Sequence, residues 1–249
     1  MRKLALLSLF ALLFGAFAYG QTLPCMNGPG SVNTFNLPCL FYAGDFNPND
    51  PNANGLANEN DAIVGGNPYG AATYQNFVYQ GGPILGLFTN NLSQLTPESG
   101  YWEIRSGVAE GNGGVLIASG VAVGQNFLQT PTGRGAFGYD EVTDAVLIPP
   151  MSLQPSETYW FAVVPLCPNC NGRSFNSNTF GAVGKIGVDI PNQQYFNSPF
   201  FAANFTNANN EGVFQEFSSG VLSIPEPSSM IMLGTGLLAA AGVVRRRLF

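Results

Sequence analysis

The sequence YWEIR at residues 101–105, with a glycine-rich segment at 111–114 and VLIAS at 115–119, decides the fold class. Both flanking segments are short and rich in aromatic or β-branched residues, which favour strands. The Gly-Asn-Gly-Gly sequence between them favours a hairpin loop. We therefore expect a strand, a long turn and a second strand between residues 101 and 123.

Further segments of strand character follow, separated by Gly, Pro, Asn or Ser. They are YWFAVV at 159–164, AVLI at 145–148, KIGVDI at 185–190, FQEF at 214–217 and VLSI at 221–224. Between the two ends of the chain, no window keeps the i, i+3, i+4, i+7 pattern of an amphipathic helix for three turns. The sequence thus predicts an all-β fold, an antiparallel β-sandwich of jelly-roll-like type.

Composition excludes several function classes. The chain has 249 residues and no histidine, so Ser-His-Asp catalysis, Cys-His catalysis and histidine-ligated metals are excluded. Residues 21–224 hold four basic and fourteen acidic residues, a formal charge of −10. Because nucleic acids are bound through clustered Lys and Arg, we expect no nucleic-acid partner.

The N-terminus has the three parts of a secretory signal peptide. Arg2 and Lys3 precede a mostly apolar run at 4–14, which small residues follow. Cleavage is expected after Ala18 or Gly20, each of which ends a small-residue site. The apolar run is shorter than the roughly 20 residues of a membrane-spanning helix. Residues 1–20 are therefore predicted to be a signal peptide of an exported protein.

The C-terminus also has three parts in a fixed order. An apolar segment at 230–244 lies between a Pro-Glu-Pro sequence and an arginine cluster. As a helix, its fifteen residues extend about 22 Å, short for a bilayer core of about 30 Å. The arginines favour a cytoplasmic end for this helix, which leaves the body of the protein on the other side of the membrane. The residues concerned are Pro225, Glu226, Pro227, Arg245, Arg246 and Arg247.

This arrangement resembles the PEP-CTERM sorting signal of Gram-negative bacteria. The resemblance implies recognition by an exosortase, a membrane transpeptidase-like protease that removes the apolar tail near Pro225-Glu226-Pro227. It further implies an inner-membrane-anchored precursor, in contact with the membrane only through this short transmembrane helix before processing. The mature protein would then reach the cell surface or the extracellular matrix of a bacterium that makes exopolysaccharide.

The resemblance divides the chain into three parts. They are a signal peptide at 1–20, a β-sandwich domain at 21–224 and a sorting signal at 225–249. The segments YWEIRSG and YWFAV, with the glycine turn between them, are similar to the β-sandwich bodies common among exported PEP-CTERM proteins. Those bodies imply no known activity.

Four cysteines, Cys25, Cys39, Cys167 and Cys170, lie in the predicted domain. An even number in an exported chain indicates disulfides. Of the three connectivities, Cys25–Cys39 with Cys167–Cys170 is favoured because each bond closes a local loop. A zinc site formed by the four thiolates and a C-x-x-C redox site are the alternatives.

The segment from Asp45 to Asp61 is rich in Asp, Asn, Pro and Gly, and it is close to the pattern of a calcium-binding loop. Side-chain oxygens at the first, third and fifth positions would converge on the cation, and Gly55 would allow the turn. A connection rich in Asx-turns is the alternative, in which case no cofactor is expected. The candidate ligands are Asp50, Asn52, Asn54, Leu56, Asn58 and Asp61.

We expect a structural or adhesive protein, not an enzyme, within or near an exopolysaccharide matrix. A calcium-dependent carbohydrate-binding module is the first alternative; its ligand would stack on the outward ring of Tyr101-Trp102 or of Tyr159-Trp160. A polysaccharide-acting hydrolase is the second, less favoured alternative. It needs two facing carboxylates, for which Glu98 with Glu103 and Asp140 with Glu141 are the nominal pairs.

Overall fold

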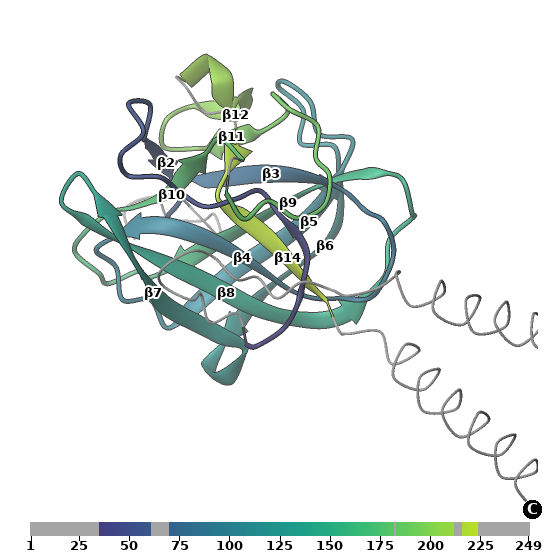
Figure 1. Cartoon of the computed structure of the whole chain (residues 1–249), viewed down its shortest axis with the longest axis horizontal. Helices are drawn as coiled ribbons and strands as arrows, with labels where there is room; N and C mark the ends of the chain where they lie inside the picture. Colours follow the sequence, from purple (N-terminus) through teal and green to yellow (C-terminus); the bar gives the residue numbers. More distant parts are fainter. Residues whose placement is uncertain (1–34, 61–69, 182, 212–215, 224–249) are drawn as a thin grey trace, which may run out of the picture. The chain divides into compact units, whose positions relative to one another are not determined.

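A computed structural model describes residues 35–60, 70–181, 183–211 and 216–223, all of them within the compact unit Leu23–Ile224 (Figure 1). Two antiparallel sheets pack together in this unit, which confirms the all-β sandwich. The predicted signal peptide and C-terminal helix lie outside the described residues. Among the residues that are described, no helix has the length and apolar character needed to cross a membrane.

The larger sheet has eight strands around β4. One edge of β4 pairs with β8, and its other edge pairs with β14 and then with β10. The eight strands are β1 (Cys39–Tyr42), β2 (Gly55–Ala57), β4 (Ile84–Ser93), β7 (Phe127–Ala136), β8 (Tyr139–Met151), β10 (Ser174–Thr179), β13 (Glu216–Phe217) and β14 (Ser219–Ser223).

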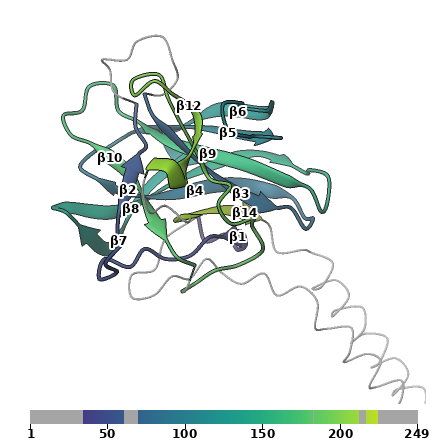
Figure 2. The same ribbon diagram turned by 90° about the horizontal axis from the view of Figure 1, so that it is seen from above.

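The second sheet has six strands in the order β12-β11-β3-β9-β5-β6, and the turned view in Figure 2 shows it lying over the larger sheet. Its strands are β3 (Ala72–Val78), β5 (Ser99–Ser106), β6 (Val115–Val123), β9 (Thr158–Leu166), β11 (Tyr195–Ser198) and β12 (Ala203–Asn207). Two 3-10 turns, η2 (Gly124–Asn126) and η3 (Ala208–Glu211), are the helical elements of the described chain.

Successive side chains of a strand point to opposite faces of the sheet, and this two-residue period decides which residues enter the core. In β5 and β9, Trp102 and Phe161 face the larger sheet and pack with Val146 of β8. The alternate side chains, Tyr101 and Trp160, face away and form a second buried cluster on the outer side of the six-stranded sheet. Both sides of this sheet are therefore apolar.

The predicted strands at 101–105, 115–119, 145–148 and 159–164 lie in β5, β6, β8 and β9 respectively. The glycine-rich segment joins β5 to β6 as expected, because these strands pair antiparallel. Two of the C-terminal segments are strands over part of their predicted length, as β13 and β14.

The prediction of a strand at 185–190 is wrong. Gly184 and Gly187 have φ of 76° and 78°, which interrupt the extended backbone, and only Ile186 forms a bridge, to Tyr42. Lys185 reaches back to two carboxylates, with Nζ 2.9 Å from Asp189 Oδ1 and 2.7 Å from Glu216 Oε1. The alternation of polar and apolar residues therefore belongs to a loop held over the sheet by ion pairs.

Candidate functional site

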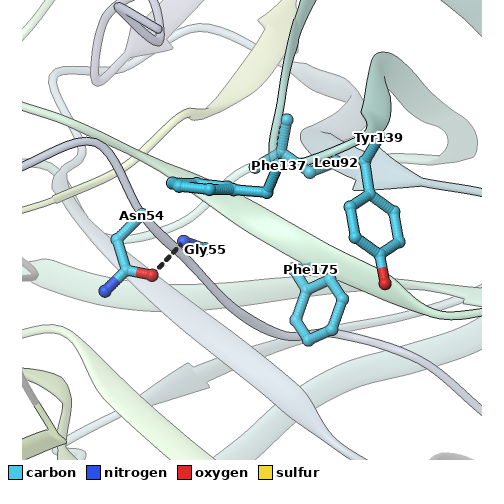
Figure 3. Close-up of a pocket in the computed structure, with 6 residues that line it drawn as sticks. All are labelled: Asn54, Gly55, Leu92, Phe137, Tyr139 and Phe175. Carbon is cyan, nitrogen blue, oxygen red and sulfur yellow. Dashed lines mark hydrogen bonds between the residues drawn. The ribbon is translucent and has the colours of Figure 1, made fainter. Parts of the chain in front are cut away.

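An open pocket of about 200 Å³ lies on the larger sheet, where the β7–β8 turn approaches β2 and β10. Figure 3 shows aromatic rings on two sides of it and a side-chain amide on another. The lining residues are Asn54, Gly55, Leu92, Phe137, Tyr139 and Phe175. None of these six residues carries a carboxylate, a thiol or an amine.

The turn between β7 and β8 places the most exposed of these rings. Phe137 and Gly138 have φ of 57° and 82°, so both central residues of the two-residue loop are left-handed. This is the geometry of a type I′ hairpin turn, in which Asn or Gly is the usual first residue. A phenylalanine there strains the backbone. Phe137 is nevertheless 66% exposed, so burial of its ring in the core does not offset the strain.

Phe175 of β10 forms the opposite wall. The ring of Tyr139 stands edge-on to it, with 5.4 Å between ring centroids and 81° between planes. The guanidinium carbon of Arg173 lies 5.3 Å from the same centroid, and Arg173 Nε is held by Glu59 Oε1 at 2.6 Å. Phe175 is therefore fixed by contacts on two sides, which preorganises the pocket wall.

Asn54 supplies the polar rim. Its backbone amide donates to Asn178 Oδ1 at 2.9 Å, which ties the loop to β10. Its side-chain oxygen accepts from the amide of Gly55 at 2.9 Å, the dashed line in Figure 3. The residue is exposed, and its side-chain amide nitrogen is a hydrogen-bond donor at the rim of the pocket lining. With the phenol of Tyr139, the pocket thus combines apolar walls and polar groups.

The candidate calcium ligands that the structure describes make other contacts. Asp50 Oδ1 accepts from the amide of Asn52 at 2.8 Å, which is an Asx-turn. Leu56 lies in β2. Asn58 is fully buried and donates to Val163 O at 2.8 Å. Asp61 lies outside the described residues, and in the part of the chain that is described no three acidic or cysteine side chains gather as a metal site.

The outward rings predicted for sugar binding are covered. Tyr101 and Trp160 are 9% and 5% exposed. Trp160 donates to Gln193 O at 2.7 Å, and Tyr101 donates to Glu103 Oε2 at 2.7 Å. Neither ring is open to a ligand. An open aromatic pocket lies on the other sheet, at Phe137, Tyr139 and Phe175, and the sequence pattern did not indicate it.

Each nominal carboxylate pair has one exposed and one buried member. Glu98 and Asp140 are exposed, whereas Glu103 and Glu141 are buried. Arg105 Nε lies 2.8 Å from Glu103 Oε1, and Arg134 Nε lies 2.5 Å from Glu141 Oε2. Both buried carboxylates are thus paired with a cation.

Arg134 also reaches Asp45, with Nη1 3.0 Å from Oδ1. Burial acts to lower the pKa of this guanidinium, but the negative charges of Glu141 and Asp45 and the hydrogen bond to Glu141 raise it overall. The arginine therefore stays charged and bridges the β7–β8 hairpin to the loop after β1. This bridge holds the hairpin that carries Phe137.

The cysteines agree with the disulfide interpretation where they are described. Cys167 and Cys170 are bonded to each other in the turn after β9, which confirms that predicted pair. Cys39 of β1 is also disulfide-bonded; its predicted partner, Cys25, lies outside the described residues. The bonded pair leaves no thiolates at Cys167 and Cys170 for zinc.

Residues 223–247 match the PEP-CTERM protein-sorting motif. No curated protein and no solved structure matches the chain. Pro225, Glu226, Pro227 and the arginine cluster all fall inside the matched segment. The chain therefore carries a PEP-CTERM sorting signal, consistent with an exosortase substrate that is secreted as a membrane-anchored precursor and processed to the cell surface.

Proposed function

We propose that this is a structural or adhesive protein of an exopolysaccharide matrix, and that it contacts polysaccharide through the aromatic pocket. The observation that carries the proposal is the strained and exposed Phe137, held opposite Phe175 and beside Tyr139. A hairpin selected only for stability would have Asn or Gly at this position. The ring therefore has a use that offsets its conformational cost.

The pocket has the mixed chemistry that a sugar ring needs. A pyranose has apolar C–H faces and a rim of hydroxyl groups. Aromatic rings such as Phe137 and Phe175 remove the apolar faces from water. The amide of Asn54 and the phenol of Tyr139 supply hydrogen-bond partners for the hydroxyls.

The size of the pocket argues for one sugar unit of a longer chain. Its volume of about 200 Å³ is below the roughly 300–1,000 Å³ of sites that enclose a whole small ligand. Binding of a single unit in so open a site is weak. A matrix polymer repeats its units, however, and many weak contacts along one polymer raise the overall avidity.

The same features support a non-catalytic role. The pocket lining lacks the two carboxylates that glycoside hydrolysis requires. Binding in the pocket also needs no cation, because its polar groups are neutral. We therefore favour a calcium-independent adhesive function over the calcium-dependent module and the hydrolase.

Affinity electrophoresis through a gel that contains the host's own exopolysaccharide tests the proposal. The processed protein should be retarded, and Phe137→Ala and Tyr139→Ala should each restore most of the free mobility. Phe200→Ala is the matched control, because Phe200 is similarly exposed (58%) but lies outside the pocket. Unchanged mobility of the wild type, or an equal effect of Phe200→Ala, contradicts the proposal. Release of reducing ends would show a hydrolase instead.

A further inference from the structure

Strand β6 is an edge of the six-stranded sheet. Its one strand neighbour in the described chain is β5, and Figure 2 shows it at the margin of the sheet. It is nine residues long, VLIASGVAV, and contains no charged residue and no proline. Its most exposed aliphatic side chains are Val115 (64%), Val123 (58%), Val121 (54%), Leu116 (46%) and Ile117 (42%).

Edge strands normally carry features that prevent pairing with another chain. β7, an edge of the larger sheet, illustrates them: it contains Pro131 and the charged Arg134, and its register shifts between Pro131 and Gly135. β6 has one irregularity, at Ile117 where its register against β5 shifts, and beyond it the strand runs without interruption to Val123. A long, exposed and uncharged edge is a template for a further strand.

The sequence of β6 is self-complementary about its midpoint, Ser119. In an antiparallel pair with a second β6, Ser119 would face its own copy, and Ile117 would face Val121 on each side. Ala118 would face Gly120 in the same pairing. The pairs of β-branched residues stabilise a sheet, and the small residues oppose each other without a steric conflict. A twofold axis at Ser119 satisfies the pairing in both copies at once.

We infer that β6 pairs antiparallel with β6 of a second copy of this chain, so that two six-stranded sheets join into one continuous sheet across a twofold axis. The self-complementary sequence of β6 favours this occupant, because a second copy supplies the matching strand. The predicted domain carries ten more acidic than basic residues, so the charged surfaces of two copies repel each other. A contact through the uncharged β6 brings no like charges of this strand together.

The inference stands apart from the proposed sugar contact, since β6 belongs to one sheet and the pocket to the other. Analytical ultracentrifugation of the processed protein over a range of concentrations tests it. The wild type should sediment as a reversible dimer, and Val121→Lys should weaken the association at least tenfold. Val188→Lys is the matched control, because Val188 is equally exposed (52%) and lies outside β6.

A cysteine at the midpoint tests the register. Because Ser119 is exposed and faces its own copy, Ser119→Cys should give a covalent dimer under mild oxidation, whereas Val188→Cys should not. Circular dichroism of each variant confirms that it is folded. A monomer at every concentration, a dimer that Val121→Lys leaves intact, or a folded Ser119→Cys protein that does not cross-link overturns the inference.

Discussion

Asn91 of β4 and Asp144 of β8, two neighbouring strands of the larger sheet, are hydrogen-bonded through their side chains, with Asn91 Nδ2 2.7 Å from Asp144 Oδ2. Gln129 Nε2 donates to the other carboxyl oxygen at 2.9 Å. Asp144 is fully buried, and this burial raises its pKa to about 7, although the bonds from Asn91 and Gln129 act to lower it. The core therefore contains a carboxyl group that changes from protonated to ionised near neutral pH.

The first prediction is that Asp144→Asn removes a pH dependence of stability. The pKa of Asp144 in the folded state lies above its value in the unfolded chain. The free energy of folding that the protonated carboxyl contributes is therefore fully present below about pH 4. It is lost as the pH rises through about 7. At pH 8 the variant should be more stable than the wild type, by up to about 4 kcal/mol. Gln129 can turn its amide to accept from the new Asn, because it is only half-buried.

Urea denaturation at pH 5 and pH 8 measures this difference. Asp140→Asn is the control, since Asp140 lies on the same strand but is exposed. Burial also raises the pKa of Glu216 to about 7, so the wild type retains a second source of pH dependence. The comparison of each variant with the wild type isolates Asp144. Equal stability differences for the two variants would contradict the assignment.

The second prediction concerns the strained turn. Phe137→Asn places a residue that tolerates the left-handed conformation at φ 57°. The free energy of unfolding should rise by about 1 kcal/mol. The same change should weaken exopolysaccharide binding about tenfold, because one aromatic wall is lost. Thermal unfolding and affinity electrophoresis of the same preparation measure the two effects.

Stability and binding should thus move in opposite directions at this one position. Phe200→Asn, at an exposed ring away from the pocket, should change binding little. A Phe137→Asn protein that binds as well as the wild type would mean that the ring has no role in the contact.

Two of the strands that the sequence predicted carry aromatic side chains on both faces. β5 and β9 are of this kind, because each lies between the sandwich core and a second buried cluster. Their composition therefore differs from that of the connecting loops, and a search for β-branched and aromatic residues finds them.

β10 was not predicted because its buried residues are polar. Ser-Phe-Asn-Ser-Asn-Thr has the composition of a loop, yet five of these six residues are buried. Asn176 Nδ2 donates to Thr73 Oγ1 at 2.7 Å and to Ser219 Oγ at 3.1 Å. The partners of this amide nitrogen lie more than 40 residues away along the chain, and sequence pattern alone does not reveal such pairing.

The pocket was missed for a related reason. Phe137 and Tyr139 flank Gly138 in a turn, where strand patterns are not sought, and Phe175 lies about 35 residues further along the chain. The Phe-Gly-Tyr sequence was the available signal, because an aromatic residue next to glycine at a hairpin tip is unusual. These two rings line a pocket only because β10 and β2 approach the turn, and this approach is a property of the fold.

The third prediction is that calcium leaves the melting temperature unchanged. A site with a dissociation constant of about 10⁻⁴ to 10⁻³ M would add about 1–2 kcal/mol at 5 mM calcium. We expect no such gain, because Asp50 accepts from the backbone and Asn58 is held in the core. A rise in melting temperature that Asp50→Ala abolishes would restore the calcium interpretation.

The fourth prediction is that the Cys167–Cys170 disulfide contributes modestly to stability. The two cysteines are three residues apart in sequence, and so short a loop limits the entropy that the bond removes from the unfolded chain. The chain-entropy relation gives about 2 kcal/mol for the double variant Cys167→Ser, Cys170→Ser. Guanidinium unfolding measures it, with Ser152→Ala as a control. A loss of more than about 4 kcal/mol would show that the bond also organises the fold after β9.

The last prediction concerns processing at the sorting motif. Replacement of Pro225, Glu226 and Pro227 by alanine should leave the arginine-rich tail on the protein, because the match at residues 223–247 begins with this segment. Mass spectrometry of the protein from its native host should show a wild type that lacks Arg245–Arg247 and a variant that retains them. Ser228→Ala with Ser229→Ala, inside the same motif, is the control and should be processed normally. Because the last described strand, β14, ends at Ser223, ahead of both substituted sites, neither change should alter the stability of the secreted body. A wild type that keeps its arginines at the cell surface would mean that the motif is not cleaved in this protein.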